Sequence, residues 1–147
     1  MERKIKVRAV IIKDGKLLCV WHKPYNDEAV DYWCTMGGTV DVGEGLLDAV
    51  VREVEEECGI TPVVGNLIFV QQYIHNGDHE QIEFFYNIEN PDDFENIDLS
   101  STSHGDLEIE KIDFIEPAKE TVYPEFLQKE DWANFDPAQN VRYFSEL

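Results

Sequence analysis

A run of acidic side chains between Arg52 and Gly59 holds the groups of this chain best suited to chemistry. The segment reads Arg52-Glu53-Val54-Glu55-Glu56-Glu57-Cys58-Gly59 and closes a stretch of helical periodicity. At about 100° per residue, Glu53, Glu56 and Glu57 fall within one arc of the helix, whereas Glu55 points elsewhere. Like charges at these spacings, in the last turns of a helix, are unfavourable to each other and to the helix dipole. The cluster therefore indicates a bound cation, against the alternative of a solvated acidic helix end.

The residues around this helix complete a longer pattern. Gly38 is followed after five residues by Glu44, and after seven more by the run from Arg52 to Ile60. At every defined position this order resembles the motif G-x5-E-x7-R-E-U-x-E-E-x-G-U of the Nudix hydrolases, in which U is a bulky aliphatic residue. The chain is therefore identified as similar to the MutT-like domains of that family, with a complete Nudix box from Gly38 to Ile60.

The resemblance implies an enzyme. Nudix hydrolases cleave a phosphoanhydride bond of a nucleoside diphosphate linked to another group, so we expect a Mg²⁺-dependent nucleotide pyrophosphohydrolase that uses metal-activated water. The expected substrate is a (d)NTP, a nucleotide sugar such as ADP-ribose, or a dinucleoside polyphosphate. Carried onto this sequence, Glu53, Glu56 and Glu57 are the ligands of Mg²⁺ or Mn²⁺, which prefer such hard oxygen donors. Glu53 is the first candidate for the base that deprotonates the water.

Other positions of the motif are expected to support the metal ligands. Arg52 would hold one or two of the helix carboxylates in orientation with its guanidinium fork. Glu44 would open the helix, where a carboxylate suits the dipole, and would lie near the metal. Gly37 and Gly38 would let the backbone approach the phosphates closely.

A further acidic ligand and the residues that contact the base are less narrowly defined. Related enzymes often take this ligand from a distant loop or strand, and the candidates here are Asp106, Glu108, Glu110 and Glu83. Glu108 or Glu110 is preferred because both share one face of an expected strand. The aromatic residues that could stack on a base are Trp21, Tyr32, Trp33, Phe85 and Tyr73. His75 and His79 flank a turn and are expected at its surface.

Composition and charge narrow the class of protein further. A length of 147 residues with 43% hydrophobic residues indicates one globular domain, residues 1–147, with no membrane-spanning run. The net charge of −19 argues against nucleic acid as a partner, and a polyphosphate would bind only with divalent cations in between. Three cysteines without a CxxC pair, and no signal-peptide pattern, favour a cytoplasmic protein. We expect a small nucleotide-type diphosphate as partner, and a monomer or homodimer.

The elements that must position these residues follow from periodicity and turn residues. Strands are expected at 5–12, 17–21, 32–36, 67–74, 81–88 and 107–115, and helical segments at 44–58 and 117–127. Asp14-Gly15 and Asn76-Gly77 predict hairpin turns, 90–105 a loop, and 132–147 a tail of undefined structure. The helix face expected to meet the core consists of Leu47, Val50, Val51, Val54 and Cys58. The pattern predicts an α+β fold, and the resemblance implies an α/β/α sandwich with a mixed, mainly antiparallel sheet.

Other functions stay open from the sequence. An enzyme similar to isopentenyl-diphosphate isomerase would share the fold, but it needs a catalytic cysteine and usually has a degenerate motif. A non-catalytic nucleotide-sensing domain would be expected to lose the helix glutamates, which this chain keeps. Decapping of mRNA would need a basic groove, which a chain of charge −19 is not expected to supply.

Overall fold

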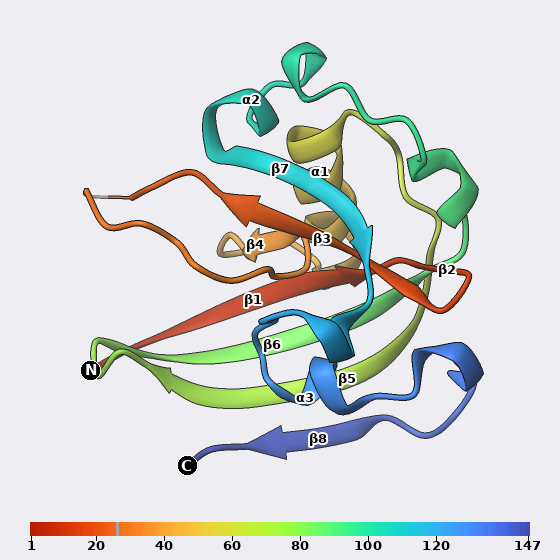
Figure 1. Ribbon diagram of the computed structural model, residues 1–147. Helices are drawn as coiled ribbons and strands as arrows, with labels where there is room; N and C mark the ends of the chain where they lie inside the picture. The colour runs from red at the N-terminus through yellow and green to blue at the C-terminus, as the bar shows by residue number, and fades with distance from the viewer. Residues whose placement is uncertain (26) are drawn as a thin grey trace.

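The computed structural model describes residues 1–25 and 27–147, which form two sheets, one long helix and several short helical turns (Figure 1). The strands are β1 (Glu2–Val10), β2 (Ile12–Lys13), β3 (Lys16–His22), β4 (Gly37–Thr39), β5 (Val64–His75), β6 (His79–Ile88), β7 (Ile109–Ile115) and β8 (Arg142–Ser145). The α-helices are α1 (Leu46–Cys58), α2 (Gly105–Glu108) and α3 (Phe126–Lys129). The 3₁₀ turns are η1 (Pro91–Phe94), η2 (Leu99–Ser101), η3 (Pro117–Lys119) and η4 (Trp132–Asn134).

The larger sheet is mixed, with its strands in the order β4-β1-β6-β5-β8. β1 pairs in parallel with β6 and β5 with β8, whereas the β1–β4 and β5–β6 pairs are antiparallel. The smaller sheet, β2-β3-β7, is antiparallel throughout. The expected α+β fold with a mixed sheet is therefore confirmed. The larger sheet of the described chain has as many parallel as antiparallel pairs, so antiparallel pairing prevails only when the smaller sheet is included.

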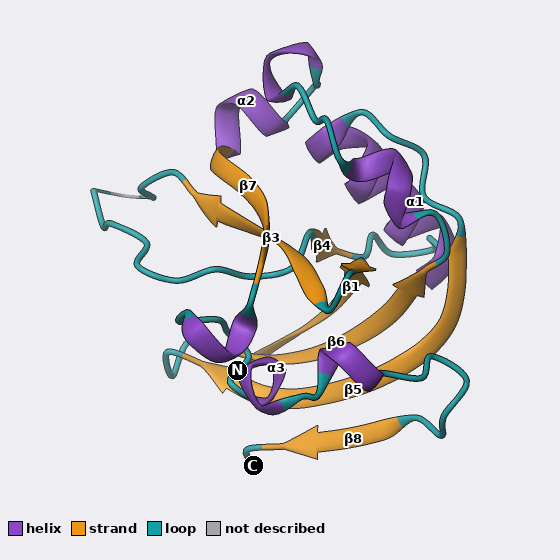
Figure 2. Ribbon diagram, turned by 45° about the vertical axis from the view of Figure 1, so that its right-hand side comes forward, coloured by secondary structure: helices purple, strands orange, loops and turns teal. Residues whose placement is uncertain are grey.

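Hydrophobic side chains pack in two cores, one on each face of the larger sheet. Alternate residues of a strand point to opposite faces. On β1, Val7 and Ala9 accordingly join the core under α1, whereas Val10 joins the second core. On β6, Tyr86 belongs to the first core and Phe85 to the second. Elements α3 and η4 cover the second core, and Figure 2 shows α3 beside β5 and well away from α1. This is the helix–sheet–helix layering that was expected.

Two tight turns lie where the residue types predicted them. Asp14 (φ 52°) and Gly15 (φ 74°) join β2 to β3, and Asn76 (φ 49°) and Gly77 (φ 69°) join β5 to β6. Two successive residues with positive φ give a turn whose twist matches that of the flanking strands. The second turn fixes the register of the longest hairpin, and that hairpin carries many of the polar residues discussed below.

Several elements differ from the expectation. Residues 32–36 make isolated bridges, Trp33 with Val122 and Cys34 with Val20, and the strand β4 begins only at Gly37. The long helix begins at Leu46 rather than at residue 44, because Gly45 is extended (φ −72°, ψ 150°) and is the N-cap. Residues 105–108 form the turn α2, since backbone N–H groups there donate to the carbonyl of His104. The strand that follows therefore starts at Ile109 and not at residue 107.

The buried face of α1 is rotated from the expected one. Its buried residues are Ala49, Val50, Val54, Glu57 and Cys58. The expectation for Leu47 is wrong, because its side chain is 52% exposed. The helix contacts β1 and β4, with the small side chain of Ala49 in the core between them. This rotation carries Glu57 inward, to 3% exposure.

The tail left undefined by the sequence completes the sheet edge. β8 pairs in parallel with β5, and the ring of Phe144 stacks on that of Phe126 in α3 at 4.0 Å between centroids. Stacked and edge-on aromatic pairs of this kind add to the stability gained from burial alone. Within residues 1–25 and 27–147, the helices are too short or too polar to span a membrane.

Candidate active site

The C-terminal half of α1 faces the glycine strand β4, and contact between them sets the positions of two glutamates. A Cβ placed on Gly38 would lie 2.5 Å from the carboxyl carbon of Glu53. A Cβ on Gly37, which has φ 155°, would lie 1.9 Å from the carbonyl oxygen of Val7 on β1. Only glycine fits at position 37, and a side chain at position 38 would displace the carboxylate of Glu53. The two glycines thus allow β4 to pack closely against β1 and against the carboxylate of Glu53.

Arg52 joins the start of the motif to the helix glutamates. Its guanidinium binds Glu44 with two hydrogen bonds, from Nε at 2.7 Å and from Nη2 at 2.9 Å. Nη1 donates to Glu53 at 2.9 Å and to Glu56 at 3.4 Å, and Nη2 donates to the carbonyl of Thr39 at 3.1 Å. Such paired, charge-assisted bonds fix orientation as well as adding energy. The guanidinium of Arg52 therefore makes the forked hydrogen bonds to the carboxylates that were expected.

Glu44 does not open the helix, contrary to the expectation. It lies one residue before the N-cap, and its carboxylate accepts a hydrogen bond from the backbone N–H of Asp41 at 3.0 Å. The hydrogen bonds from Arg52 lower the pKa of Glu44 to about 2. Glu44 therefore closes the loop before α1 and orients Arg52, which in turn orients the carboxylates that follow.

Glu57 is a buried carboxylate with little to replace the water that would stabilise its charge. Its Oε2 accepts a hydrogen bond from the backbone N–H of Gly37 at 3.2 Å. Burial raises the pKa of Glu57 to about 8, and the charge of Glu53 adds to the effect. The pKa of Glu53 is also raised by burial, in spite of its hydrogen bond from Arg52. Removing a carboxylate from water is costly unless a positive charge or several donors replace the water.

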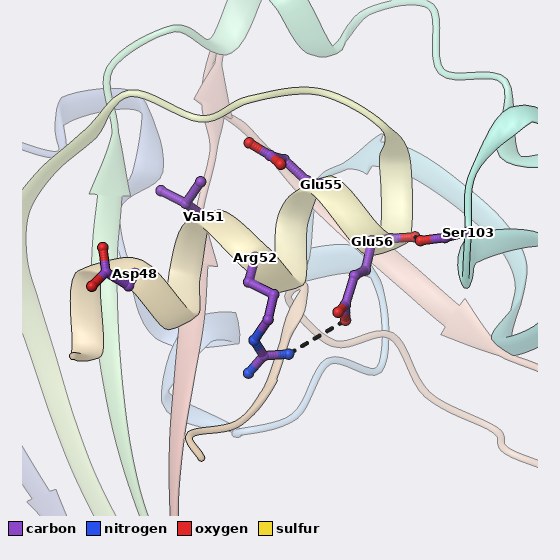
Figure 3. A pocket seen from close by; sticks show the side chains of 6 residues that line it. All are labelled: Asp48, Val51, Arg52, Glu55, Glu56 and Ser103. Atoms are coloured by element: carbon purple, nitrogen blue, oxygen red, sulfur yellow. Dashed lines mark hydrogen bonds and ion pairs between the residues drawn. The ribbon is translucent and has the colours of Figure 1, made fainter. Parts of the chain in front are cut away.

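Glu56 is the most accessible carboxylate of the three, with a side chain 27% exposed. Besides Arg52, it lies 3.1 Å from Nδ1 of His104, which the loop before α2 brings over the end of the helix. Glu55 is turned to another side, where it accepts a hydrogen bond from Thr61. Figure 3 shows Arg52 and Glu56 turned toward each other and Glu55 pointing away from them. The division between Glu55 and the other three glutamates is the one that the helical spacing predicted.

The donor set fits a hard divalent cation in its chemistry. Glu53, Glu56 and Glu57 offer carboxylate oxygens only, and among the residues that the structure describes Glu57 has no cationic partner at hydrogen-bond distance although it is buried. Within residues 1–25 and 27–147, no three His, Cys, Asp or Glu side chains already surround a common point in a way that could hold a metal ion. Arg52 already donates hydrogen bonds to oxygens of Glu53 and Glu56. A cation bound to these two carboxylates would have to share them with the guanidinium. The metal ligands stay a prediction.

The four candidates for a further acidic ligand lie in different surroundings. Glu108, at the end of α2, lies near enough to Glu57 that its charge contributes to the raised pKa of Glu57. Glu110 lies on β7 and Glu108 in α2, and both are exposed, so the two residues do not share a strand face as expected. Glu83 is ion-paired with Arg8 at 2.6 Å, and the backbone of Asp106 contacts Lys23. Of the expected alternatives, Glu108 is the one whose charge acts on Glu57.

Sequence reasoning missed Arg8, which links the glutamates to a second region. Its Nε donates to Glu83 at 2.6 Å and its Nη1 to the carbonyl of Thr35 at 3.2 Å. Its positive charge also reaches Glu53 and Glu57, whose pKa values it lowers against the effect of burial. The signal available in the sequence was the alternation of Lys4, Lys6 and Arg8 with the apolar residues Ile5, Val7 and Ala9.

Two cavities adjoin these residues. A shallow one of about 450 Å³ lies on the outer side of α1 and is lined by Asp48, Val51, Arg52, Glu55, Glu56 and Ser103 (Figure 3). A larger one of about 550 Å³ adjoins Arg8, and we call it the sheet cavity. Its lining residues are Lys6, Arg8, His22, Tyr32, Cys34, Gln71, Tyr73, His75, Asn76, His79, Gln81, Glu83, Tyr123, Pro124, Glu125 and Glu146.

The expected aromatic residues are divided between this cavity and the core. Tyr32 and Tyr73 line the sheet cavity. Phe85 and Trp33 are buried in the second core, and Trp21 packs edge-on against Trp33. These three are poorly placed to stack on a base. The expectation for the turn histidines is wrong for His79, which is only 7% exposed because it folds back toward Gln81.

Comparisons with known proteins identify the family. The family model described as the NUDIX domain matches residues 2–132. ADP-ribose pyrophosphatase of Methanocaldococcus jannaschii is 38% identical over 66 residues, which are 45% of this chain and 38% of that protein. CTP pyrophosphohydrolase of Escherichia coli is also 38% identical over 66 residues, 45% of this chain and 48% of that protein. The matched region thus spans less than half the length of these curated relatives.

Solved structures share the fold. A MutT NUDIX hydrolase from Burkholderia pseudomallei superimposes with a TM-score of 0.68 at 20% identity, over 89% of this chain and 98% of the other. A MutT protein from Methanosarcina mazei Go1 superimposes with a TM-score of 0.67 at 23% identity, over 87% and 89% of the two chains. At these identities the likeness shows a common architecture.

Proposed function

The chain belongs to the NUDIX domain family, and we propose that it hydrolyses a phosphoanhydride bond of a nucleoside diphosphate linked to another group, with Mg²⁺ or Mn²⁺ as cofactor. The observation that carries the proposal is a set of three glutamates on one face of α1. Arg52 binds Glu53 and Glu56, whereas Glu57 is buried with no cationic partner at hydrogen-bond distance among the residues that the structure describes. Burying a carboxylate without a positive charge beside it costs free energy. A divalent cation bound there would supply the missing positive charge.

The proposed roles follow from the positions of the side chains. Glu53, Glu56 and Glu57 would hold the cation, with Glu108 as a further ligand. Bound metal lowers the pKa of coordinated water and neutralises charge on phosphate oxygens. Glu53, pressed against Gly38 and held by Arg52, is the proposed acceptor of the proton of the attacking water.

Arg52 and Glu44 are proposed to act through the ligands rather than on the substrate. Arg52 keeps Glu53 and Glu56 at fixed angles, and Glu44 holds Arg52 with two hydrogen bonds. Residues of this kind, which orient the groups around a metal, commonly contribute about 10- to 100-fold to affinity or activity. Gly37 contributes its backbone N–H to Glu57, and Gly38 the space beside Glu53.

The substrate is proposed to be a nucleotide-type pyrophosphate. The names of the two curated relatives concern ADP-ribose and CTP, and the overlap with each is limited to 66 residues. Both compounds contain a nucleoside diphosphate unit, which is the common chemistry we propose here. We also infer a cytoplasmic location, because the three cysteines are buried free thiols. That residues 1–147 are one domain, and a monomer or homodimer, stays a prediction.

An isomerase of the isopentenyl-diphosphate type is less well supported. It needs a cysteine that reacts, and the cavity-lining cysteine is Cys34. Burial raises the pKa of Cys34 to about 11, so its thiol is protonated and a poor acid–base or nucleophilic group near neutral pH.

The proposal is tested by incubating the purified chain with ADP-ribose, CTP and a dinucleoside polyphosphate, each with Mg²⁺ and with Mn²⁺, and separating the products by ion-exchange chromatography. We expect metal-dependent release of a nucleoside monophosphate from at least one compound, abolished by EDTA. The variant Glu55→Gln should keep this activity, because Glu55 faces away from the other glutamates. Absence of cleavage with every compound and both metals would contradict the proposal.

A further inference from the structure

The loop between η2 and α2 closes over the C-terminal end of α1. The last carbonyls of a helix have no partner within it, and here the loop supplies donors. The backbone N–H of His104 donates to the carbonyl of Glu56 at 2.9 Å, and Oγ of Ser103 donates to the same carbonyl at 3.4 Å. Figure 3 shows Ser103 beside Glu56 at this end of the helix. The loop is therefore attached to α1 at a residue that carries a proposed metal ligand.

The loop and the helix approach each other most closely at Gly105, the first residue of α2. A Cβ on Gly105 would lie 2.1 Å from the carbonyl oxygen of Glu57 and 2.5 Å from Oγ1 of Thr102. The first of these atoms belongs to the backbone, which cannot turn away as a side chain can. Only glycine therefore fits at this position. The start of α2 is thus held at a fixed place on the end of α1.

His104 joins two residues of the proposed metal site that lie on different helices. Its Nδ1 lies 3.1 Å from Oε2 of Glu56 on α1, and because a carboxylate accepts hydrogen bonds, Nδ1 is the donor. Its carbonyl accepts the backbone N–H groups of Leu107 and Glu108 on α2, each at 3.1 Å. One residue therefore holds both the side chain of Glu56 and the backbone that carries Glu108.

Each of the three helix glutamates has one carboxylate oxygen that accepts a hydrogen bond and another that has no partner within the part of the chain that the structure describes. The bonded oxygens are Oε1 of Glu53 and Oε2 of Glu56 and Glu57. Oε2 of Glu56 receives two donors, Nη1 of Arg52 at 3.4 Å and Nδ1 of His104 at 3.1 Å. Because the bond from His104 is the shorter, the orientation of this carboxylate depends chiefly on His104.

Glu56 needs such a restraint more than the other two glutamates do. Its side chain is 27% exposed, whereas that of Glu53 is 15% exposed and Glu57 is buried. Packing limits the rotation of a buried side chain, but a more exposed one loses conformational entropy when it is fixed by a ligand. A hydrogen bond that already fixes the carboxylate reduces this loss on binding.

We propose that His104 is a positioning residue of the metal site. It holds Oε2 of Glu56, leaves Oε1 to the cation, and links this carboxylate to the backbone of Glu108. Hydrogen bonds of this kind to metal ligands typically contribute about 10- to 100-fold to metal affinity. That the bound group is a divalent cation rests on the proposed function. The role requires a hydrogen-bond donor at this place and no change of charge on the imidazole.

The proposal is tested by isothermal titration of metal-depleted protein with Mn²⁺, which measures affinity without any turnover. The matched variants are His104→Leu and His104→Asn, whose side chains have nearly the same shape, although only the amide of asparagine can donate to Glu56. We expect Kd for Mn²⁺ to rise about 10- to 100-fold in His104→Leu and to stay close to that of the wild type in His104→Asn. Wild-type affinity in His104→Leu, an equal loss in both variants, or no Mn²⁺ binding by the wild type would each overturn the proposal.

The control for the loop itself is Ser103→Ala. Oγ of Ser103 binds the carbonyl of Glu56 and not its carboxylate, so this variant should bind Mn²⁺ like the wild type. A loss equal to that in His104→Leu would overturn the role of the imidazole. Because the side chain of His104 is 46% exposed, we expect urea unfolding in EDTA to show little change in stability in His104→Leu. Should this variant fail to fold, His104→Ala takes its place in the comparison.

Hydrolysis assays separate this inference from the proposed function. A Mn²⁺ affinity that depends on His104, without cleavage of any nucleotide compound, would remove the proposed hydrolysis and leave the role of His104 standing. Metal-dependent hydrolysis with wild-type Mn²⁺ affinity in His104→Leu would do the reverse. If both proposals are correct, the Mg²⁺ concentration for half-maximal rate rises in His104→Leu, while kcat at saturating Mg²⁺ changes much less.

Discussion

Two carboxylates of this protein are almost equally buried but are stabilised differently. Glu83 is 2% exposed and lies 2.6 Å from the guanidinium of Arg8, whereas Glu57 is 3% exposed and has a backbone N–H at 3.2 Å. The protein itself therefore supplies the counter-charge of Glu83. At Glu57 the counter-charge would have to come from a ligand, and we predict that this ligand is a divalent cation.

The largest expected effect is on catalysis. Glu57→Gln should reduce turnover of the best substrate by orders of magnitude, because it removes a charged metal ligand while its amide oxygen can still accept from Gly37. Unfolding free energy without metal should be unchanged or higher at neutral pH, because burial raises the pKa of Glu57 to about 8 and the wild type must either take up a proton or bury a charge when it folds. Steady-state kinetics and urea unfolding measure the two quantities. Wild-type turnover in Glu57→Gln, with Glu55→Gln as control, would contradict the metal assignment.

The opposite result is expected for the paired carboxylate. Glu83→Gln should lower the free energy of unfolding by about 3–5 kcal/mol, because it leaves the buried guanidinium of Arg8 without its partner. Urea unfolding of this variant is compared with that of Glu80→Gln. Glu80 pairs with Arg3, which is 60% exposed, so that change should cost much less than Glu83→Gln. Equal costs for Glu83→Gln and Glu57→Gln would remove the distinction between the two sites.

A smaller effect is expected at the arginine that braces the helix. Arg52→Lys should lower kcat/KM by about 10- to 100-fold, because one ammonium group cannot bind Glu44, Glu53 and Glu56 together. Arg3→Lys is the matched control at an exposed ion pair and should have no measurable effect on activity. If both variants keep wild-type kcat/KM, Arg52 does not position the glutamates.

The two regions also differ in how far the sequence predicts them. The three glutamates and Arg52 lie on one helix, where spacing alone determines which side chains share a face. Arg8 and Glu83 are 75 positions apart and meet only because β1 pairs in parallel with β6. Such pairing is a property of the whole sheet, and no local pattern contains it. The arrangement of the glutamates was therefore predictable from a short motif, but the cavity beside it was not.

The features that the sequence pattern did not predict correctly also depend on contacts between distant elements. Leu47 follows the apolar spacing of α1 but is exposed, because contact with β1 and β4 turns the helix toward Ala49 and Glu57. The tail gave no periodic signal, and β8 forms only because β5 offers an open edge. By contrast, the turns at residues 14–15 and 76–77 depend on local backbone preference and were predicted correctly.

Thermal unfolding of EDTA-treated protein, with and without added Mg²⁺, tests the central claim most directly. Metal that binds only the folded state raises stability by linkage, by about 2.7 kcal/mol at 100 times its dissociation constant. We predict that millimolar Mg²⁺ or Mn²⁺ raises Tm of the wild type and of Glu55→Gln, and raises that of Glu57→Gln much less. An unchanged Tm of the wild type with both metals, or an equal rise in Glu57→Gln, would contradict the account.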